Sequence, residues 1–376
     1  MRVLLFGTYD TRLHPRIKTI AEGLRDQGAD VAECNAPLGL DTAARVKLLK
    51  QPWRLPALAA RLANRWAELA LKSRRLPWRP HVVVVGYLGH FDVHLARLLF
   101  PRTTIVLDHM VSASGTGQDR GLDGGPRKAL LRAIDSAALR AADVVVVDTV
   151  EHLQMLPERH GGRTVVVPVG APSAWFRPVS GHAGALRVVF YGLYTPLQGA
   201  PVIGEALALL AGKEIEVTMI GTGQDYAATR AAAEGNLRVR WLDWIPSEEL
   251  PELVAGHDVC LGIFGTGDKA RRVVPNKVFQ GAAAGCAIVT SDTAPQRRAF
   301  GDAAVLVPPG DAKALAEALA GFAADRAALA QARDRARSVA SAAFAPGAVV
   351  GPLMYLAGSG PRDRPGARAA SAPSAG

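Results

Sequence analysis

The sequence is poor in cysteine, and its three cysteines lie far apart. Cys34, Cys260 and Cys286 form no C-x-x-C pair, which excludes a disulfide framework or a zinc knuckle and favours a reducing, cytoplasmic setting. No apolar run approaches the ~20 residues that a membrane-spanning helix needs. The opening stretch MRVLLFGTYD has only a short apolar run before a glycine. It therefore predicts a first β-strand rather than a signal peptide.

The common cofactor and metal motifs are also missing. The run GTGQDY (221–226) has Tyr226 where a dinucleotide fingerprint needs a third glycine. The sequence contains no GKS or GKT of a phosphate-binding P-loop, and no HExxH, GxSxG or DxD. No Cys and His residues are spaced as metal ligands. We therefore expect no cofactor and no metal ion.

Acidic residues are scarce relative to basic ones, and the net charge is +10. Residues 41–80 hold ten Lys or Arg against Asp41 and Glu68. Such a basic balance is typical of proteins that meet nucleic acid, a membrane surface or acidic substrates.

The basic stretch has a helical pattern over residues 45–80. An apolar face flanked by basic residues, with tryptophans as anchors, favours a helix lying on an anionic membrane surface. A helix packed on the core with a solvated basic face is the main alternative. Nucleic-acid binding is disfavoured because no nucleic-acid module is present. The expected face is Leu58, Leu62, Trp66 and Leu69, and the anchors are Trp53, Trp66 and Trp78.

Short β-branched runs alternate with helical patterns along the whole chain, as in HVVVVG (81–86) and DVVVVD (143–148). Continuous apolar strands that alternate with helices predict an α/β fold with parallel sheets, whose ligands bind at the carboxyl ends of the strands. The series restarts after a stretch rich in Pro, Gly and Ser. We therefore predict two doubly wound, Rossmann-like domains that face a cleft. The expected boundaries are 1–170 for the N-terminal domain, 171–186 for a linker, 187–343 for the C-terminal domain, 344–359 for a segment packing back on the first domain, and 360–376 for a disordered tail.

In the first half, polar residues follow two predicted strands. Gly7 permits a tight turn in GTYDTRLHPR, and the helix that starts near Pro15 offers backbone N–H groups to an anion. Asp108 and His109 end another strand, where a histidine can bond a sugar hydroxyl or a phosphate. A solvated loop and a histidine bonded to backbone remain the alternatives. The candidate ligand-binding residues of this half are Gly7, Tyr9, Asp10, His14, Arg16 and Asp108.

In the second half, glycine turns follow two successive strands. Gly192 and Gly199 flank one turn, and Gly221 and Gly223 form the next. Each turn alone is explained by packing, but two at matching strand ends favour a phosphate close to the backbone.

The stretch DKARRVVPNKVFQGAAAG (268–285) places basic residues at the start of a helix, the end at which the helix dipole disfavours cations. An anion would offset both the dipole and the side chains. A solvated run of charge is the alternative. We expect Lys269, Arg271, Arg272 and Lys277 to lie over an anion, with Pro275 and Asn276 at the helix start and Gln280 one turn later.

The second half resembles the donor-binding domain of the GT-B glycosyltransferases of family 4, the glycosyl transferases group 1. The matching pieces include VVFYGLYTPLQGAPVIGEAL, VTMIGTGQD and PNKVFQGAAAGCAIVTSD, in the order of the family. The resemblance implies a nucleotide-diphosphate sugar as donor, a hydroxyl as acceptor, retention at the anomeric carbon and no metal requirement. It implies a sugar or phosphate contact for His109 and leaving-group stabilisation by Lys269, Arg272 and Lys277. The first half resembles the acceptor-side domain of the family more loosely, which implies that Gly7, Tyr9, Asp10, His14, Arg16 and Asp108 are acceptor-side residues. The donor site implied is Gly192, Tyr194, Gln198, Gly221, Thr222, Gly223, Ile245, Pro275, Asn276, Val278 and Gln280.

The sequence departs from the family at its diphosphate-binding cations. An arginine is replaced at Leu193 or Tyr194, and a lysine is replaced by Gln198. The ribose-binding glutamate falls at Gln280, and its partner falls at Arg272. We expect the cations of the 268–285 stretch to compensate for these losses.

From these features we expect a transferase that acts on a lipid-linked or cell-envelope glycan, in the cytoplasm or peripherally on the inner face of the cell membrane. Two alternatives stay open. One is a non-catalytic homologue that binds a nucleotide-sugar or a partner protein. The other is a nucleotide-sugar epimerase, which would need carboxylates facing the sugar.

Overall fold

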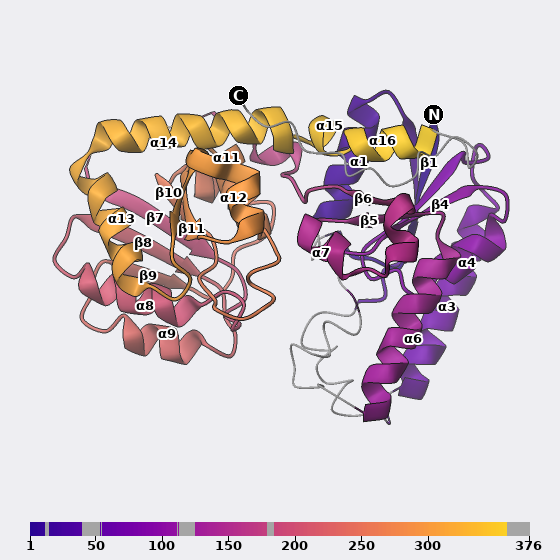
Figure 1. Ribbon diagram of the computed structural model, residues 1–376, viewed down its shortest axis with the longest axis horizontal. Helices are drawn as coiled ribbons and strands as arrows, with labels where there is room; N and C mark the ends of the chain where they lie inside the picture. The colour runs from indigo at the N-terminus through magenta and orange to yellow at the C-terminus, as the bar shows by residue number, and fades with distance from the viewer. Residues whose placement is uncertain are drawn as a thin grey trace. The chain divides into compact units, whose positions relative to one another are not determined.

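The computed structural model describes residues 1–11, 15–39, 53, 55–110, 112, 125–178 and 184–358. The chain divides into two compact units, Met1–Pro168 with Val350–Gly376, and Val169–Val349. Each unit contains one six-stranded sheet of parallel strands with helices between them (Figure 1). The predicted α/β class with two doubly wound units is confirmed.

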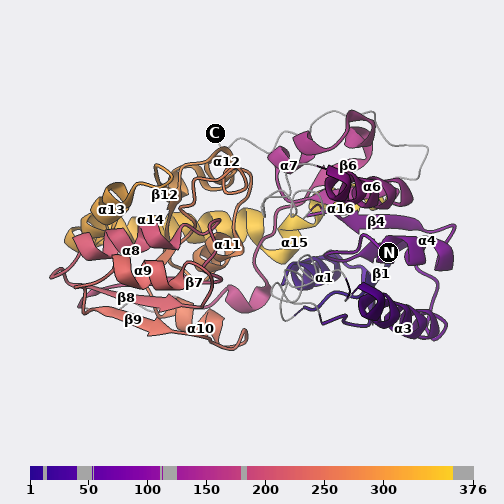
Figure 2. The same ribbon diagram turned by 90° about the horizontal axis from the view of Figure 1, so that it is seen from below.

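The sheet of the first unit has the strand order β2-β1-β3-β4-β5-β6. Strands β3 and β5 are each four consecutive valines and are buried on both faces, so helices must cover both sides of this sheet. Figure 2 shows helices on both sides of the strands. The strands are β1 (Arg2–Gly7), β2 (Asp30–Asn35), β3 (Val82–Val85), β4 (Thr104–Asp108), β5 (Val144–Val147) and β6 (Thr164–Val166). The helices are α1 (Arg16–Asp26), α3 (Leu55–Ser73), α4 (Asp92–Leu99), α6 (Gly125–Ala141), α7 (Val150–Met155) and α16 (Gly351–Gly358), with a 3₁₀ turn at Glu158–Arg163.

The sheet of the second unit has the order β12-β11-β10-β7-β8-β9. Its core is built from the apolar strands and from the inner faces of α8 and α13. The strands are β7 (Leu186–Tyr191), β8 (Ile215–Ile220), β9 (Val239–Leu242), β10 (Val259–Leu261), β11 (Ala287–Ser291) and β12 (Ala304–Val307). The helices are α8 (Ala200–Leu209), α9 (Tyr226–Ala232), α10 (Leu250–Ala255), α11 (Asn276–Ala283), α12 (Ala294–Phe300), α13 (Ala312–Ala324), α14 (Arg326–Val339) and α15 (Pro346–Val349).

Both sheets contain a switch point, where successive connections run towards opposite edges. It lies between β1 and β3 in the first unit and between β7 and β10 in the second. Open α/β sheets bind ligands beside such points, at the carboxyl ends of the strands. The fold therefore marks one candidate ligand edge on each unit.

The segments between and after the sheets are more packed than the sequence suggests. Ala171 and Trp175 fall in the stretch interpreted as a linker, yet both are buried, and Trp175 stacks on Tyr191 with ring centroids 5.9 Å apart. Residues 179–183 lie outside the described residues. Phe344 packs on Phe279 in the second unit, whereas α16 lies beside β5 and β6 of the first unit. The segment 344–359 is thus divided between the units, and the tail 360–376 lies outside the described residues.

Helix α3 occupies the middle of the basic stretch. Leu69 is buried, and Trp66 packs on the core of the first unit while its Nε1 donates a hydrogen bond to Asp92. The second half of the helix therefore packs on the core, as the alternative interpretation holds. Its first half is mostly exposed, and Trp53 ahead of it is 71% exposed. Residues 45–52 and 54 lie outside the described residues.

Candidate functional site

The switch point of the second unit is lined by two glycine turns that touch each other. Gly192 follows β7 and Gly221 follows β8, both with a positive φ. A Cβ added to Gly221 would lie 2.0 Å from the carbonyl oxygen of Gly192, so no other residue fits there. Gly223 and Thr222 come next and are exposed. Close contact between the turns requires these glycines, and it also leaves backbone accessible at the strand ends.

Lys277 reaches this edge from helix α11. Its ammonium donates a hydrogen bond of 2.5 Å to Gln198 Oε1 and lies 3.7 Å from the ring centroid of Phe190. A Cβ on Gly192 would lie 3.3 Å from Nζ, so the ammonium stands directly against the first glycine turn. The side chain is buried, and burial lowers the pKa of Lys277 to about 7. The structure therefore places a cation of this helix beside Gln198, where the family resemblance implies a lysine.

The other predicted cations are placed differently. Arg272 pairs with Asp268 at 3.5 Å and its side chain is 38% exposed. Arg271 is exposed and Lys269 is half-buried. Of the four basic residues expected to lie over an anion, Lys277 is thus the one whose charged group is found against the glycine turn.

Gln280 is buried one turn into α11, and its Oε1 accepts a hydrogen bond of 2.9 Å from the Tyr191 hydroxyl. The oxygen that we expected to meet a ribose is therefore bonded inside the unit. Burying a neutral amide beside a tyrosine avoids the cost of burying a carboxylate, which explains how glutamine fits where the resemblance implies glutamate.

Two residues of the expected donor site lie in the core instead. Tyr194 is fully buried between the rings of Phe190 and Tyr226, and Val278 is fully buried as well. Both side chains pack inside the unit: Tyr194 lies in the turn after β7, and Val278 lies on the buried face of α11. The remaining three, Ile245, Pro275 and Asn276, are half-buried.

The first turn of the first unit is held by a carboxylate that the sequence analysis missed. Asp92 Oδ2 accepts hydrogen bonds from Thr8 N and Oγ1 at 2.7 and 2.8 Å, and burial raises the pKa of Asp92. A Cβ on Gly7 would lie 3.0 Å from this oxygen. Asp92 is the first residue of helix α4, and this position is the only feature of the sequence that could have pointed to its role.

The other residues predicted in GTYDTRLHPR have different places. Tyr9 is buried and its hydroxyl donates to Glu33 at 2.8 Å, so it supports β2. Asp10 is half-buried. His14 lies outside the described residues.

Arg16 and Asp108 form a buried ion pair between α1 and the end of β4. Arg16 Nε donates to both carboxylate oxygens at 2.9 Å, and Arg16 is 1% exposed. Burial raises the pKa of Asp108, and the guanidinium opposes that shift. The terminal nitrogens Nη1 and Nη2 of Arg16 are buried, and no hydrogen-bond partner for them is found among the described residues.

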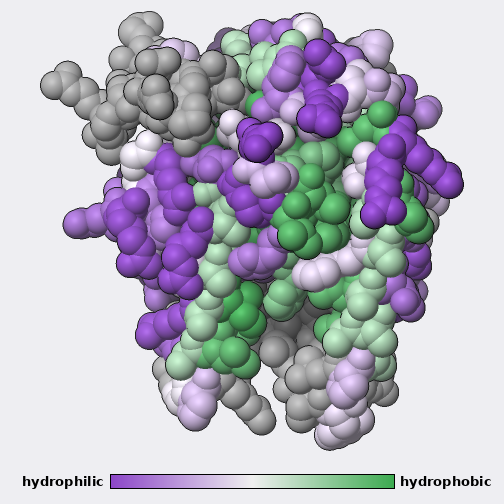
Figure 3. Space-filling model, turned by 90° about the vertical axis from the view of Figure 1, so that its right-hand side faces the viewer, coloured by the Kyte–Doolittle hydropathy of each residue, from purple (hydrophilic) through white to green (hydrophobic). Residues whose placement is uncertain are grey.

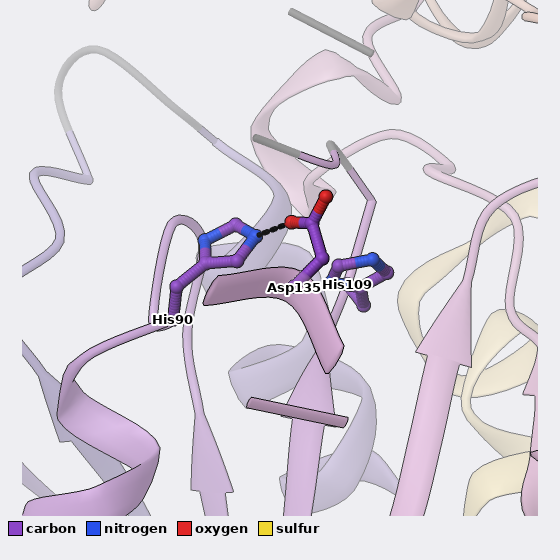
Figure 4. A group of neighbouring side chains, drawn as sticks. All are labelled: His90, His109 and Asp135. Carbon is purple, nitrogen blue, oxygen red and sulfur yellow. Dashed lines mark ion pairs between the residues drawn. The ribbon is translucent and has the colours of Figure 1, made fainter. Parts of the chain in front are cut away.

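His109 belongs to a buried group with His90 and Asp135 (Figure 4). His90 Nε2 lies 3.1 Å from Asp135 Oδ1, and the rings of His90 and His109 meet edge to face at 5.2 Å. Burial, reinforced by His90, lowers the pKa of His109 to about 4, so its ring is neutral at pH 7. Its Nδ1 is buried and finds no partner within the described part of the chain. The three residues each bring one ligand-type atom within 4.8 Å of the others, but Asp135 is already paired with His90.

A second His–Asp pair follows β5, next to β4 in the sheet. His152 Nδ1 lies 2.5 Å from Asp148 Oδ1. Asp148 is buried and also raises the pKa of Asp108. This pair was not predicted from the sequence, although Asp148 ends the run DVVVVD and a histidine follows four residues later.

Comparisons with known proteins agree with this architecture. Residues 185–325 match the family described as Glycosyl transferases group 1. No curated protein is similar enough to match the chain.

Similar solved structures cover nearly the whole chain. Sucrose-phosphate synthase from Thermosynechococcus elongatus is 16% identical with a TM-score of 0.67, over 94% of this chain and 97% of that one. HepE of Anabaena in complex with UDP-glucose is 15% identical with a TM-score of 0.65, over 95% and 98%. A glycosyltransferase from Rickettsia africae is 13% identical with a TM-score of 0.62, over 95% and 97%. At these identities the likeness is one of fold. The chain has the GT-B fold, and residues 185–325 of its second unit match the group 1 glycosyltransferase family.

Proposed function

We propose that this protein transfers a sugar from a nucleotide-diphosphate donor to a hydroxyl, with retention at the anomeric carbon and without a metal ion. The acceptor proposed is a lipid-linked or cell-envelope glycan. The observation that carries the proposal is the buried ammonium of Lys277 against the Gly192 turn.

Lys277 is suited to hold a diphosphate because no carboxylate is found paired with its ammonium in the described part of the chain. Its ammonium contacts a neutral amide, an aromatic ring and a glycine turn. A cation in such a dry site gains more from an arriving anion than a solvated one does. Gln198 then acts as a positioning residue that directs the ammonium towards the turn.

The transfer breaks the bond between the anomeric carbon and the donor phosphate oxygen and forms a bond to the acceptor oxygen. The leaving diphosphate gains negative charge, which Lys277 stabilises as it develops. The acceptor proton passes to the departing phosphate oxygen, so a separate carboxylate base is not required. A fixed cation thereby does what a bound metal does in other enzymes.

We propose further that the protein is cytoplasmic and attaches peripherally to an anionic membrane surface. Among the described residues no helix combines the length and apolar character needed to cross a bilayer. The exposed start of α3 carries Arg61, and Trp53 precedes it. Figure 3 shows apolar side chains in several areas among hydrophilic ones on one face of the first unit. Flotation with liposomes tests this: the protein should rise with vesicles containing anionic lipid and stay behind with neutral ones, whereas equal behaviour contradicts it.

Thermal shift with nucleotides tests the donor site. UDP or GDP should raise the Tm by a few degrees at saturating concentration, because the ligand binds the folded state alone. Lys313→Ala, at an exposed lysine of the same unit, should keep the shift, and Lys277→Met should lose it. Indifference of the wild type to both nucleotides and to their sugars would reject a donor site.

A non-catalytic nucleotide-sugar binder is the second candidate, favoured by the loss of the cations at Leu193 or Tyr194 and Gln198. It predicts the same thermal shift but no release of UDP or GDP when acceptors are supplied. Nucleotide release measured over a panel of glycans separates the two functions.

A further inference from the structure

Three side chains of the kind that bind metal ions meet inside the first unit (Figure 4). His90 lies between β3 and α4, His109 follows β4, and Asp135 belongs to α6. All three are buried, and each brings one ligand-type atom within 4.8 Å of the others. Two imidazoles and one carboxylate are a ligand set that divalent transition metals bind. The three come from separate segments, which is why no metal motif is visible in the sequence.

The hydrogen bonding of both histidines is incomplete. His109 Nδ1 is buried and has no partner among the described residues. His90 Nε2 is also buried and makes no hydrogen bond within that part of the chain, although Asp135 Oδ1 lies 3.1 Å away. These two atoms are therefore close without the alignment that a hydrogen bond requires. Because nearly all buried polar groups in folded proteins are bonded, two such nitrogens in one group point to a ligand from outside the chain.

The distances within the group suit a zinc ion. Zinc binds imidazole nitrogen and carboxylate oxygen at about 2.0–2.2 Å, so two ligand atoms of a tetrahedral zinc lie about 3.3 Å apart. The 3.1 Å between His90 Nε2 and Asp135 Oδ1 is close to such an edge. The ligand atom of His109 lies within 4.8 Å of both. A side-chain shift of at most about 1.5 Å therefore brings it to bonding distance.

The ring of His109 is in the protonation state that a metal ion needs. Burial, reinforced by His90, lowers the pKa of His109 to about 4, so the neutral ring offers a lone pair at pH 7. A histidine must be unprotonated to bind a metal. Calcium and magnesium prefer oxygen ligands, whereas imidazole nitrogens suit zinc. The chemistry of the group therefore favours zinc over these two ions.

We propose that His90, His109 and Asp135 bind one zinc ion, which fixes α6 to the turn after β3 and to the end of β4. Three protein ligands leave a fourth position, which a water molecule fills in zinc sites of this kind. Counted from the helix start, Asp135 is the first buried side chain among those described in α6. The ion thus holds the helix where it meets the core. It takes no part in the sugar transfer proposed above, in which Lys277 of the second unit stabilises the leaving group.

Zinc binding to the full chain tests this, with protein purified without a polyhistidine tag and stripped by a chelator. Competition with a chromophoric chelator should give one zinc ion per chain in the wild type. Asp135→Asn and His109→Gln should each weaken the affinity about 100-fold or more, because even groups that only orient metal ligands contribute about 10- to 100-fold. His94→Gln, at an exposed position of α4, should bind zinc as the wild type does.

Two further measurements identify the ligands and the effect on the fold. X-ray absorption of the zinc-loaded wild type needs no variant and should show two imidazoles and an oxygen at about 2.0–2.2 Å, without sulfur. Zinc should slow hydrogen exchange in α6 of the wild type, and Asp135→Asn should abolish that protection. The inference is overturned if the wild type binds no zinc, if both ligand variants bind it as tightly as the wild type, or if sulfur lies in the zinc shell.

Discussion

The carboxyl edges of the two sheets hold buried cations in opposite ways. In the second unit Lys277 has a neutral amide and an aromatic ring around its ammonium. In the first unit Arg16 is paired with Asp108, and the nearby imidazoles of His90 and His152 are each paired with a carboxylate. Within the described residues, the same fold thus builds one edge where no carboxylate is found beside the buried cation and one edge where the buried cation is paired with a carboxylate. The difference supports the proposal that an anion binds at the edge of the second unit.

Removal of Asp108 should have the largest effect. Asp108→Ala leaves the guanidinium of Arg16 buried without its counter-ion, which is expected to lower the free energy of unfolding by about 3–5 kcal/mol. Chemical denaturation followed by circular dichroism measures it. Replacement of both partners, Arg16→Met with Asp108→Leu, should recover most of the loss. A cost below about 1 kcal/mol for Asp108→Ala would mean that the pair is solvated and that the edge is not balanced as described.

The next effect concerns the cation of the second unit. Lys277→Met keeps the packing on Phe190 but removes the charge, and kcat/KM for the donor should fall about 100- to 1000-fold. Adding Gln198→Lys to that variant returns a cation to the place that the family resemblance implies. This double variant should recover at least about tenfold in kcat/KM. Unchanged kinetics in Lys277→Met would remove the residue from the mechanism.

A smaller effect should appear in the pH dependence of nucleotide binding. The pKa of Lys277 is lowered to about 7 by burial in the free protein, and a bound diphosphate favours the charged form and so raises that pKa. Binding therefore takes up a proton above pH 7. The association constant for UDP should be flat below pH 7 and fall by up to about tenfold per pH unit above it. Calorimetry between pH 6 and 9 measures the slope, and Lys277→Met should flatten it.

The smallest effect is expected for Arg272, in the basic loop that precedes helix α11. Arg272 pairs with Asp268 at 3.5 Å with its side chain 38% exposed, and such surface pairs contribute about 0–1 kcal/mol. Arg272→Ala should therefore change the donor KM less than about threefold. A loss as large as that of Lys277→Met would show that the whole basic loop, rather than one buried lysine, holds the donor.

The sequence determined the architecture because buried parallel strands carry a local signal. The valine runs of β3 and β5 and the glycine turns after β7 and β8 are visible one segment at a time. The position of Lys277 at the start of a helix was also visible. Its contact with Gln198, 79 positions away, was not, because it depends on how two crossovers bring the ends of β7 and β10 together.

Tertiary structure alone decided the polar pairs of the first unit and the internal roles of several expected ligands. The pair Arg16–Asp108 spans 92 positions, and Asp92 and Asp135 find their partners, Thr8 and His90, in distant segments. Asp148 pairs with His152 only four positions away, but its burial depends on the fold. Tyr194 and Val278 match the family pattern yet point into the core. A sequence states which side chains are present. Whether a charge is balanced or left unpaired depends on burial and on neighbours that only the folded chain supplies.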